Sequence, residues 1–185
     1  LAGSGAVALE AGTLLTLGTA GDASFGGSFG GAGGLVKQGS GGLTLAAASS
    51  HTGGTQVLQG RLLVSDDRQL GAVAGGLLLD GGTLATTGAG TVALDTGRSV
   101  VVGIQGGVLD VAAAADLDLR GPVSGSGALV KQGGGALVLA GDNSGFVGAL
   151  DLQAGSLVLQ HAFALGGANT LHLGAGTLLE VPQNA

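Results

Sequence analysis

A six-residue segment occurs twice in this chain, 94 positions apart. Residues 34–39 read Gly-Leu-Val-Lys-Gln-Gly and residues 128–133 read Ala-Leu-Val-Lys-Gln-Gly, so the two lysines differ by 131 − 37 = 94 positions. The similarity continues on both sides of the segment, with a short slip in one loop. It predicts an internal duplication of residues 12–90 and 106–185, and therefore a repeat protein rather than a domain with a single rounded core.

Within each copy, leucine and valine alternate with other residues at a period of two. The alternating apolar pairs are Leu15 and Leu17, Leu43 and Leu45, Leu77 and Leu79, Val92 and Leu94, Leu117 and Leu119, Leu137 and Leu139, Leu150 and Leu152, and Leu171 and Leu173. Such alternation is typical of strands with one inward face. Glycine-containing dipeptides precede many of these pairs, at residues 12–13, 53–54, 81–82, 106–107 and 176–177. Because glycine tolerates positive φ, they predict tight corners between short strands.

The composition argues against the other repetitive classes. Glycine contributes 42 of the 185 residues, whereas there are only 4 Phe and no Trp, Tyr, Met or Cys. Collagen is excluded because glycine does not recur at every third position, and abundant Leu and Val argue against disorder. The one stretch that resembles a helix, residues 111–116, lacks length and capping residues.

These observations predict an all-β fold, a parallel β-solenoid that forms one segment over residues 1–185. A coil of such a repeat takes about 20–25 residues, so the chain has room for roughly eight coils. Coils of this kind stack at about 4.8 Å and align like residues in ladders. We expect Leu and Val to fill the interior.

The charge excludes one class of partner. The formal net charge is −6 and the pI is near 4.6, so no basic stripe is available for phosphates, and aromatic stacking platforms are lacking. Nucleic acid is therefore not an expected partner. Acidic residues interrupt the apolar runs, and no membrane-spanning helix is predicted. The sequence starts at Leu1 and contains no Met, which suggests an internal fragment whose signal peptide, if one exists, lies outside it.

A longer motif surrounds the first copy of the lysine. It comprises residues 33–45 (Gly-Gly-Leu-Val-Lys-Gln-Gly-Ser-Gly-Gly-Leu-Thr-Leu), 50–55 (Ser-His-Thr-Gly-Gly-Thr) and 60–64 (Gly-Arg-Leu-Leu-Val). The motif resembles the passenger-associated transport repeat of bacterial autotransporters, which reads approximately Gly-x-Leu-x-Lys-x-Gly-x-Gly-x-Leu-x-Leu, then a Tyr-Thr-Gly-Gly-Thr turn and Gly-x-Leu. The aromatic residue before the turn corresponds to His51 in the first copy and Phe146 in the second, where the turn reads Val-Gly-Ala-Leu.

The resemblance implies a right-handed, single-stranded β-helix in an exported passenger. Such a passenger crosses the inner membrane and then its own C-terminal outer-membrane β-barrel, which lies outside these 185 residues. The implied location is extracellular or on the surface of a Gram-negative bacterium. In this family the repeats are associated with secretion and folding, so the expected function is a β-helical stalk segment that supports translocation and presents a distal functional region.

Two other functions stay open. The ladder faces of a solenoid could form an adhesin or a self-association surface, with a host surface or further copies as partners. A polysaccharide-degrading enzyme of β-helical form ranks last, because clustered acids and bases and sugar-stacking aromatic residues are lacking. We therefore expect no enzymatic activity, no catalytic residue, no cofactor and no small-molecule substrate.

The most conspicuous polar residues are the two Lys-Gln pairs. Lys37-Gln38 and Lys131-Gln132 take equivalent places in both copies, which favours a structural task such as covering a coil edge or bonding a neighbouring carbonyl. Three histidines, His51, His161 and His172, have no partner at zinc-ligand spacing and no companion cysteine. A solvent-facing side chain is the expectation for each, and no metal site is predicted.

Carboxylates are most concentrated at Asp95, Asp110, Asp116 and Asp118. A solenoid could bring some of them together as a calcium site or as an acid and base pair, although the Gly-Gly-x-Gly-x-Asp pattern of calcium-binding β-rolls is missing. Solvation of the outer face is the favoured interpretation. Residues 26–30 (Gly-Gly-Ser-Phe-Gly) formally match the Gly-x-Ser-x-Gly elbow of serine hydrolases, but no strand-turn-helix context surrounds them.

Overall fold

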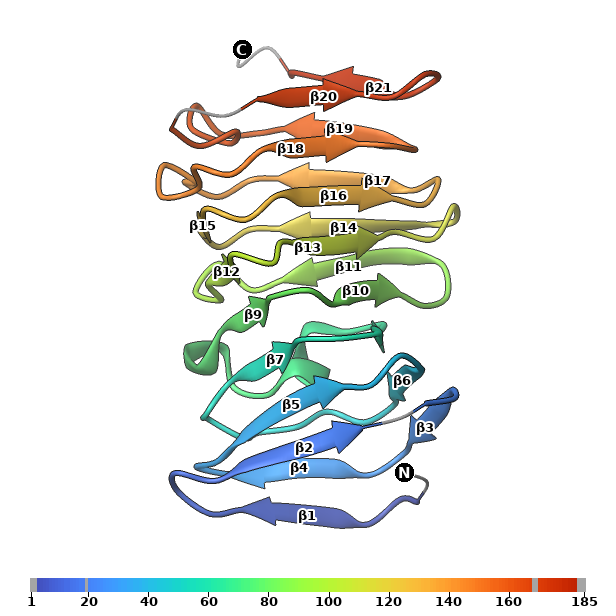
Figure 1. The fold of residues 1–185 in the computed structure, drawn as a ribbon, viewed down its shortest axis with the longest axis vertical. Helices are drawn as coiled ribbons and strands as arrows, with labels where there is room; N and C mark the ends of the chain where they lie inside the picture. The colour runs from blue at the N-terminus through green and yellow to red at the C-terminus, as the bar shows by residue number, and fades with distance from the viewer. Residues whose placement is uncertain (1–2, 19, 168–169, 183–185) are drawn as a thin grey trace.

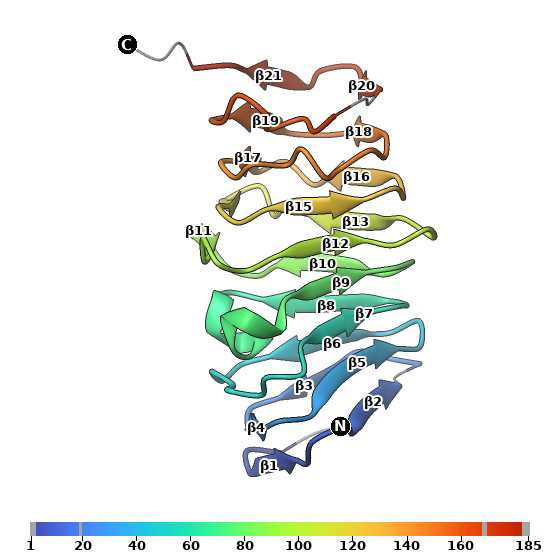
Figure 2. The ribbon, with the colours of Figure 1, turned by 90° about the vertical axis from the view of Figure 1, so that its left-hand side faces the viewer.

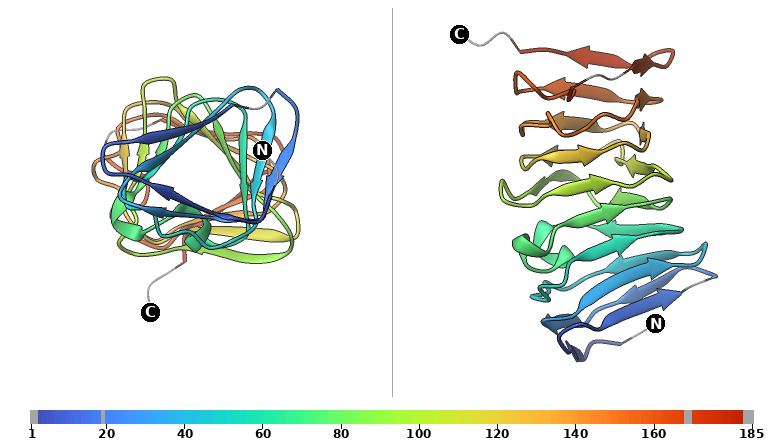
Figure 3. Two further views of the ribbon diagram at one scale, coloured as in Figure 1. Left: turned by 90° about the horizontal axis from the view of Figure 1, so that it is seen from below. Right: turned by 60° about the vertical axis from the view of Figure 1, so that its left-hand side comes forward.

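The computed structural model describes residues 3–18, 20–167 and 170–182. These residues wind into a column of stacked coils, with β1 (Ala6–Leu9) at one end of the column and β21 (Leu178–Glu180) at the other (Figure 1). Seen along the axis, successive coils overlie one another around a common centre (Figure 3). The largest sheet has eight strands, one from each successive coil. The predicted all-β, parallel solenoid of roughly eight coils is confirmed.

Three faces surround the interior, and neighbouring strands on each face are parallel. Face 1 consists of β2 (Leu14–Gly18), β5 (Gly34–Gln38), β7 (Thr55–Val57), β9 (Leu77–Leu79), β12 (Val100–Val102) and β15 (Val123–Gly125). Face 2 consists of β3 (Ala23–Phe25), β6 (Gly42–Leu45), β8 (Arg61–Val64), β10 (Thr83–Thr86), β13 (Gly107–Asp110), β16 (Leu129–Gln132), β18 (Leu150–Leu152) and β20 (Leu171–Leu173). Face 3 consists of β11 (Gly90–Leu94), β14 (Ala115–Leu119), β17 (Ala136–Leu139), β19 (Ser156–Leu159) and β21 (Leu178–Glu180). In the first coils, the pair β1 (Ala6–Leu9) and β4 (Ser28–Gly31) takes the place of face 3 in the order along the chain.

Leucine ladders fill the interior, as the alternation predicts. On face 2, Leu62, Leu84 and Leu109 are aligned in register on successive strands, and all are fully buried. Burying a leucine side chain contributes about 1.5–3 kcal/mol, so each coil is stabilised mainly by the coils on either side of it. In the last described coil, Leu173 occupies the same ladder and is 53% exposed.

Glycine makes the corners, as predicted. Each of the five glycine-containing dipeptides contains a residue with positive φ, for example Gly54 at 81° and Gly106 at 76°. All positive-φ residues of the described chain are glycines. A side chain at these positions would strain the backbone, which explains the abundance of glycine.

The two lysine segments lie on different faces. Lys37 belongs to β5 on face 1, and its register rises through Val57, Leu79 and Val102 to Gly125 on β15. Lys131 lies on the following strand, β16, on face 2. A spacing of 94 residues therefore equals four coils plus one corner, and the second segment is turned by one face relative to the first. The duplication of residues 12–90 and 106–185 stays a prediction.

One coil contains two short helical turns that the sequence pattern did not predict. The 3-10 turns η1 (Asp67–Leu70) and η2 (Val73–Gly75) stand between β8 and β9, where later coils have a face 3 strand. Figure 2 shows them as coiled ribbons at one side of the column. The helix-like stretch 111–116 contains a corner and the start of β14 instead. In the part of the chain that the structure describes, no helix has the length and hydropathy of a membrane span.

Candidate functional site

Lys131 occupies an inward position in a leucine ladder. Its register neighbours on face 2 are Leu109 and Leu152, and its side chain is fully buried. The ammonium group lies at the corner, where Nζ donates to the carbonyls of the next two residues at 2.9 and 2.8 Å. It also donates to the carbonyl of Ala154 in the next coil at 3.1 Å. One side chain thus joins two coils and donates to three corner carbonyls, of which that of Gln132 also accepts from the backbone N–H of Val111 at 3.0 Å.

Lys37 makes the same arrangement on face 1. It lies between Leu17 and Val57 in register, and Nζ donates to the carbonyls of the next two residues at 2.7 and 2.8 Å. The third bond reaches Gln59 in the next coil at 3.2 Å. The predicted bonding to neighbouring carbonyls is confirmed for both lysines. Their inward burial was not predicted.

A second coil-to-coil contact accompanies each lysine. Asn143 is buried, accepts from the backbone N–H of Val123 at 2.7 Å and donates to the carbonyl of Ala164 at 2.7 Å, so it bonds the coils on both sides. In the first copy the position 94 residues earlier is Ser49, whose Oγ accepts from the backbone N–H of Phe29 at 3.1 Å. Sequence reasoning missed both residues.

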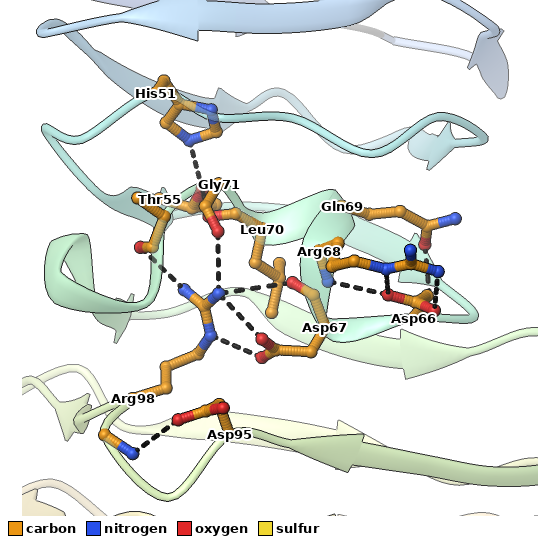
Figure 4. A network of polar contacts seen from close by, with 12 residues as sticks. His51, Thr55, Asp66, Asp67, Arg68, Gln69, Leu70, Gly71, Asp95 and Arg98 are labelled. Carbon is orange, nitrogen blue, oxygen red and sulfur yellow. Dashed lines mark hydrogen bonds and ion pairs between the residues drawn. The ribbon is translucent and has the colours of Figure 1, made fainter.

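Arg98 fastens the helical turns to the coil that follows. Its side chain is completely buried, and Nε lies 2.5 Å from Oδ1 of Asp67 while a terminal nitrogen lies 3.1 Å from Oδ2. The guanidinium also donates to the carbonyls of Gly71 at 2.8 Å and Ala72 at 3.4 Å. Figure 4 shows this fork reaching from its own coil to η1 and the loop after it.

The start of η1 is held by local hydrogen bonds. Asp66 accepts from the backbone N–H of Arg68 at 2.9 Å, and the side chain of Gln69 accepts from the backbone N–H groups of Ser65 and Asp66 at 2.8 and 3.3 Å. This is a capping box, which satisfies amide groups that the first turn leaves without partners. The Asp-x-x-Gln spacing was the sequence signal for η1.

The expectation of a solvent-facing His51 is wrong. Its side chain is fully buried, with Nε2 3.0 Å from Oγ1 of Thr55 and its ring edge-on to Phe29 at a centroid distance of 6.3 Å. The reason is that His51 points inward at a position where the second copy places the buried Phe146. His161 and His172 are exposed, as expected.

The four aspartates of the predicted acidic concentration do not form one cluster, although Asp116 and Asp118 both lie on β14. Asp95 is exposed at the corner after β11, and Asp116 is exposed on β14. Asp110 forms an ion pair with Arg61 at 2.7 Å, and Asp118 pairs with Arg120 at 2.6 Å. Among the described residues, no three His, Asp or Glu side chains are grouped so that they could hold a metal ion.

Residues 26–30, the formal Gly-x-Ser-x-Gly match, do not form a nucleophile elbow, and a groove on face 2 is lined by Asp22, Arg61 and Leu63. Ser28 is the first residue of β4 and pairs in register with Ala6, so it does not lie on a strand-to-helix turn. An open groove follows face 1 over β7, β9 and β12, but its lining is glycine, Thr55, Gln56, Ser99 and apolar side chains, without a titratable group.

Comparison with known proteins places the chain in a family. The model of the passenger-associated transport repeat matches residues 35–64 and 129–159. The adhesin BmaC autotransporter of Brucella suis biovar 1 (strain 1330) is 41% identical over 180 residues, which are 97% of this chain and 5% of that protein. The chain is a segment of an autotransporter passenger. It spans about a twentieth of the length of the curated relative it matches. No solved structure matches it.

The two transport repeats contain the coil-to-coil contacts described above. Each matched segment includes a buried lysine that bonds three carbonyls, and each includes the paired position Ser49 or Asn143. Because the second repeat is turned by one face, the lysines act at different corners of the passenger. The repeat motif therefore joins one coil to the next by the same lysine contacts, whether it lies on face 1 or on face 2.

Replacing Lys131 with methionine should destabilise the passenger segment. Methionine fills the ladder but removes the lysine donor from the carbonyls of Gly133 and Ala154, whereas that of Gln132 keeps the backbone N–H of Val111. An unsatisfied buried polar group costs about 1–3 kcal/mol. Urea unfolding at pH 7 measures the loss. Replacing Gln153 with alanine is the control, because Gln153 is exposed and its loss should change the stability by less than about 0.5 kcal/mol. Equal stability of Lys131→Met and the natural chain would contradict the assigned role.

The pH dependence of the unfolding free energy gives a second test of the role of Lys131. Burial lowers the pKa of Lys131 from 10.5 to about 8, although the negative Asp110 partly offsets this effect. At any pH between about 8 and 10.5, the unfolded chain therefore binds more protons at this lysine than the folded chain does. The stability advantage of the natural chain over Lys131→Met should therefore grow as pH rises from about 8 to about 10.5.

Proposed function

We propose that the chain is a β-helical stalk segment that supports translocation and folding of its passenger and presents a distal functional region. The observation that carries the proposal is the contact made by each repeat lysine, which bonds the carbonyls of its own corner and one carbonyl of the following coil. A coil that forms these bonds when its neighbouring coil is present also buries apolar surface. The folded coil then resists movement back through the outer membrane. Folding would then favour outward movement.

The partners and location follow from the family. The proposed partner in the full-length protein is its own C-terminal outer-membrane β-barrel, and the proposed location is the surface of a Gram-negative bacterium or the medium around it. A role without catalysis agrees with the relative, which is named an adhesin.

Deletion of whole coils tests the stalk proposal. Leu129 pairs with Leu150, so removing residues 129–149 takes out one coil with Lys131 and keeps the faces in phase. Val100 pairs with Val123, so removing residues 100–122 takes out one coil outside both transport repeats. In the full-length passenger the first deletion should lower surface display several-fold more than the second, as measured by antibody labelling of intact cells. Equal display would count against a special role of the repeat.

The alternative is that the segment is itself an adhesin or a self-association surface. The name of the relative favours adhesion. The charges limit which surfaces it can approach, because all six cationic side chains are described and each is buried or in an ion pair. The carboxylates outside these ion pairs leave a net negative surface, which repels anionic glycans and further copies of the chain within about 10 Å at 0.1 M salt. Binding to cells at low salt, or side-by-side dimers in sedimentation, would favour the alternative.

A further inference from the structure

The segment 65–76, which contains η1 and η2, is held between two buried basic side chains. Arg98 bonds it from the C-terminal side, and His51 lies against it from the N-terminal side (Figure 4). The contact with His51 is close, because a Cβ on Gly71 would lie 2.6 Å from both Cε1 and Nε2 of the imidazole. The backbone N–H of Ala72 also donates to the carbonyl of His51 at 2.9 Å. Gly71 therefore covers the imidazole, and lifting the segment exposes it.

The hydrogen bonds favour one tautomer of this histidine. The hydroxyl of Thr55 donates to the carbonyl of Leu70 at 3.0 Å, so its oxygen is left to accept from Nε2–H of His51, 3.0 Å away. The neutral ring then carries its lone pair on Nδ1. This atom is buried and has no hydrogen-bond partner among the described residues. A second proton has to be added at Nδ1, inside the column.

We propose that His51 is an acid-sensitive latch for segment 65–76: protonation at Nδ1 places a second buried cation beside Arg98 and releases the segment from the column. The charged groups that face the imidazole are few. Arg98 approaches from the corner after β11 with its partner Asp67 from η1, whereas Asp66 and Arg68 pair with each other at the surface. On the N-terminal side the neighbour is the ring of Phe29, which does not titrate.

The electrostatics agree with release on acidification. Burial, the largest effect, lowers the pKa of His51 from 6.5; the Phe29 backbone counteracts this in part, and the positive charge of Arg98 adds to it. The open segment therefore binds the proton more readily than the closed one. Closure is fully favoured above pH 6.5 and loses stability as pH falls from 6.5 toward the lower pKa of the closed state. Each pH unit by which the pKa of His51 differs between the open and closed states raises the equilibrium constant for opening of segment 65–76 at low pH by about tenfold.

Hydrogen exchange of the 185-residue chain at pH 7.5 and pH 5 tests the latch. After correction for the intrinsic exchange rate, protection of the Ala72 amide and its neighbours in 65–76 should fall several-fold at pH 5, while protection of β14 and β17 should stay constant. The control is His51→Phe, because the second repeat has the buried Phe146 at the corresponding place. This variant should keep its protection at both pH values. A similar loss in His51→Phe, or constant protection in the natural chain, would refute the proposal.

A second measurement leaves His51 in place. In a chain with His161→Gln and His172→Gln, both exposed positions, the imidazole of His51 gives the only histidine signal in an NMR titration. Its protonation midpoint should lie below 6.5, and protection of 65–76 should fall between pH 6.5 and that midpoint and level off below it. A midpoint at or above 6.5, or a loss of protection that falls outside this pH range, would overturn the assignment even if His51→Phe does not fold.

Discussion

Replacing Arg98 with methionine should lower the free energy of unfolding by about 3–5 kcal/mol, because removing one partner of a buried ion pair leaves the other charge uncompensated. The carboxylate of Asp67 is only 13% exposed and would lose both of its guanidinium bonds. The carbonyl of Gly71 would lose its guanidinium donor as well, whereas that of Ala72 would keep the backbone N–H of Gly75 at 3.0 Å. The loss is measured by urea unfolding followed by far-ultraviolet circular dichroism.

Two further variants separate this effect from a general loss of charge. Arg120 pairs with Asp118 at 2.6 Å, but its side chain is 50% exposed, so Arg120→Met should cost less than about 1 kcal/mol. Adding Asp67→Asn to Arg98→Met should recover part of the stability, because no uncompensated charge is then buried. If Arg98→Met and Arg120→Met proved equally mild, the buried ion pair of Arg98 with Asp67 would not be a major source of stability.

The strands and corners of this fold were predictable because they follow from local rules. Alternation of leucine at a period of two places Leu43, Leu45, Leu137 and Leu139 inward, and all four are buried. Positive φ is accessible to glycine at low cost, so the corners were marked by the sequence as well. The offset of 94 residues indicated a repeat. Only the coil length, which the structure gives, shows that the second lysine segment lies on the next face of the solenoid and not above the first.

The buried polar side chains were harder to predict because their burial depends on partners from other coils. Lys37 follows Leu35 at a period of two, which was a signal for an inward side chain, but a lysine is placed inside only when nearby carbonyls accept its protons. His51 was misplaced for a similar reason, since its environment is completed by Gly71, twenty residues later. The ion pair of Arg98 with Asp67 spans 31 positions, and no local pattern indicates it.

Some glycines are required because neighbouring coils approach closely, and the sequence alone does not distinguish them from glycines that are required for a turn. At the corner between faces 1 and 2, the backbones of Gly103, Gly127 and Gly148 are stacked on consecutive coils. A Cβ on Gly127 would lie 1.7 Å from the carbonyl oxygen of Gly103, and a Cβ on Gly148 would lie 2.0 Å from that of Gly127. Neither residue has positive φ, so the requirement for glycine here comes from packing and not from the turn.

Replacing Gly127 with alanine should therefore cost about 3 kcal/mol or more, because the clashing atom belongs to the backbone and the two coils would have to separate. The matched control is Gly18→Ala: this glycine also lacks positive φ, and no atom lies within 4 Å of its added Cβ. Its effect should be within about 0.5 kcal/mol, or slightly stabilising, since alanine restricts the unfolded chain. Thermal melts of both variants measure the difference. A mild effect of Gly127→Ala would mean that neighbouring coils can separate locally at this corner, and that the ladders on the three faces carry most of the cohesion.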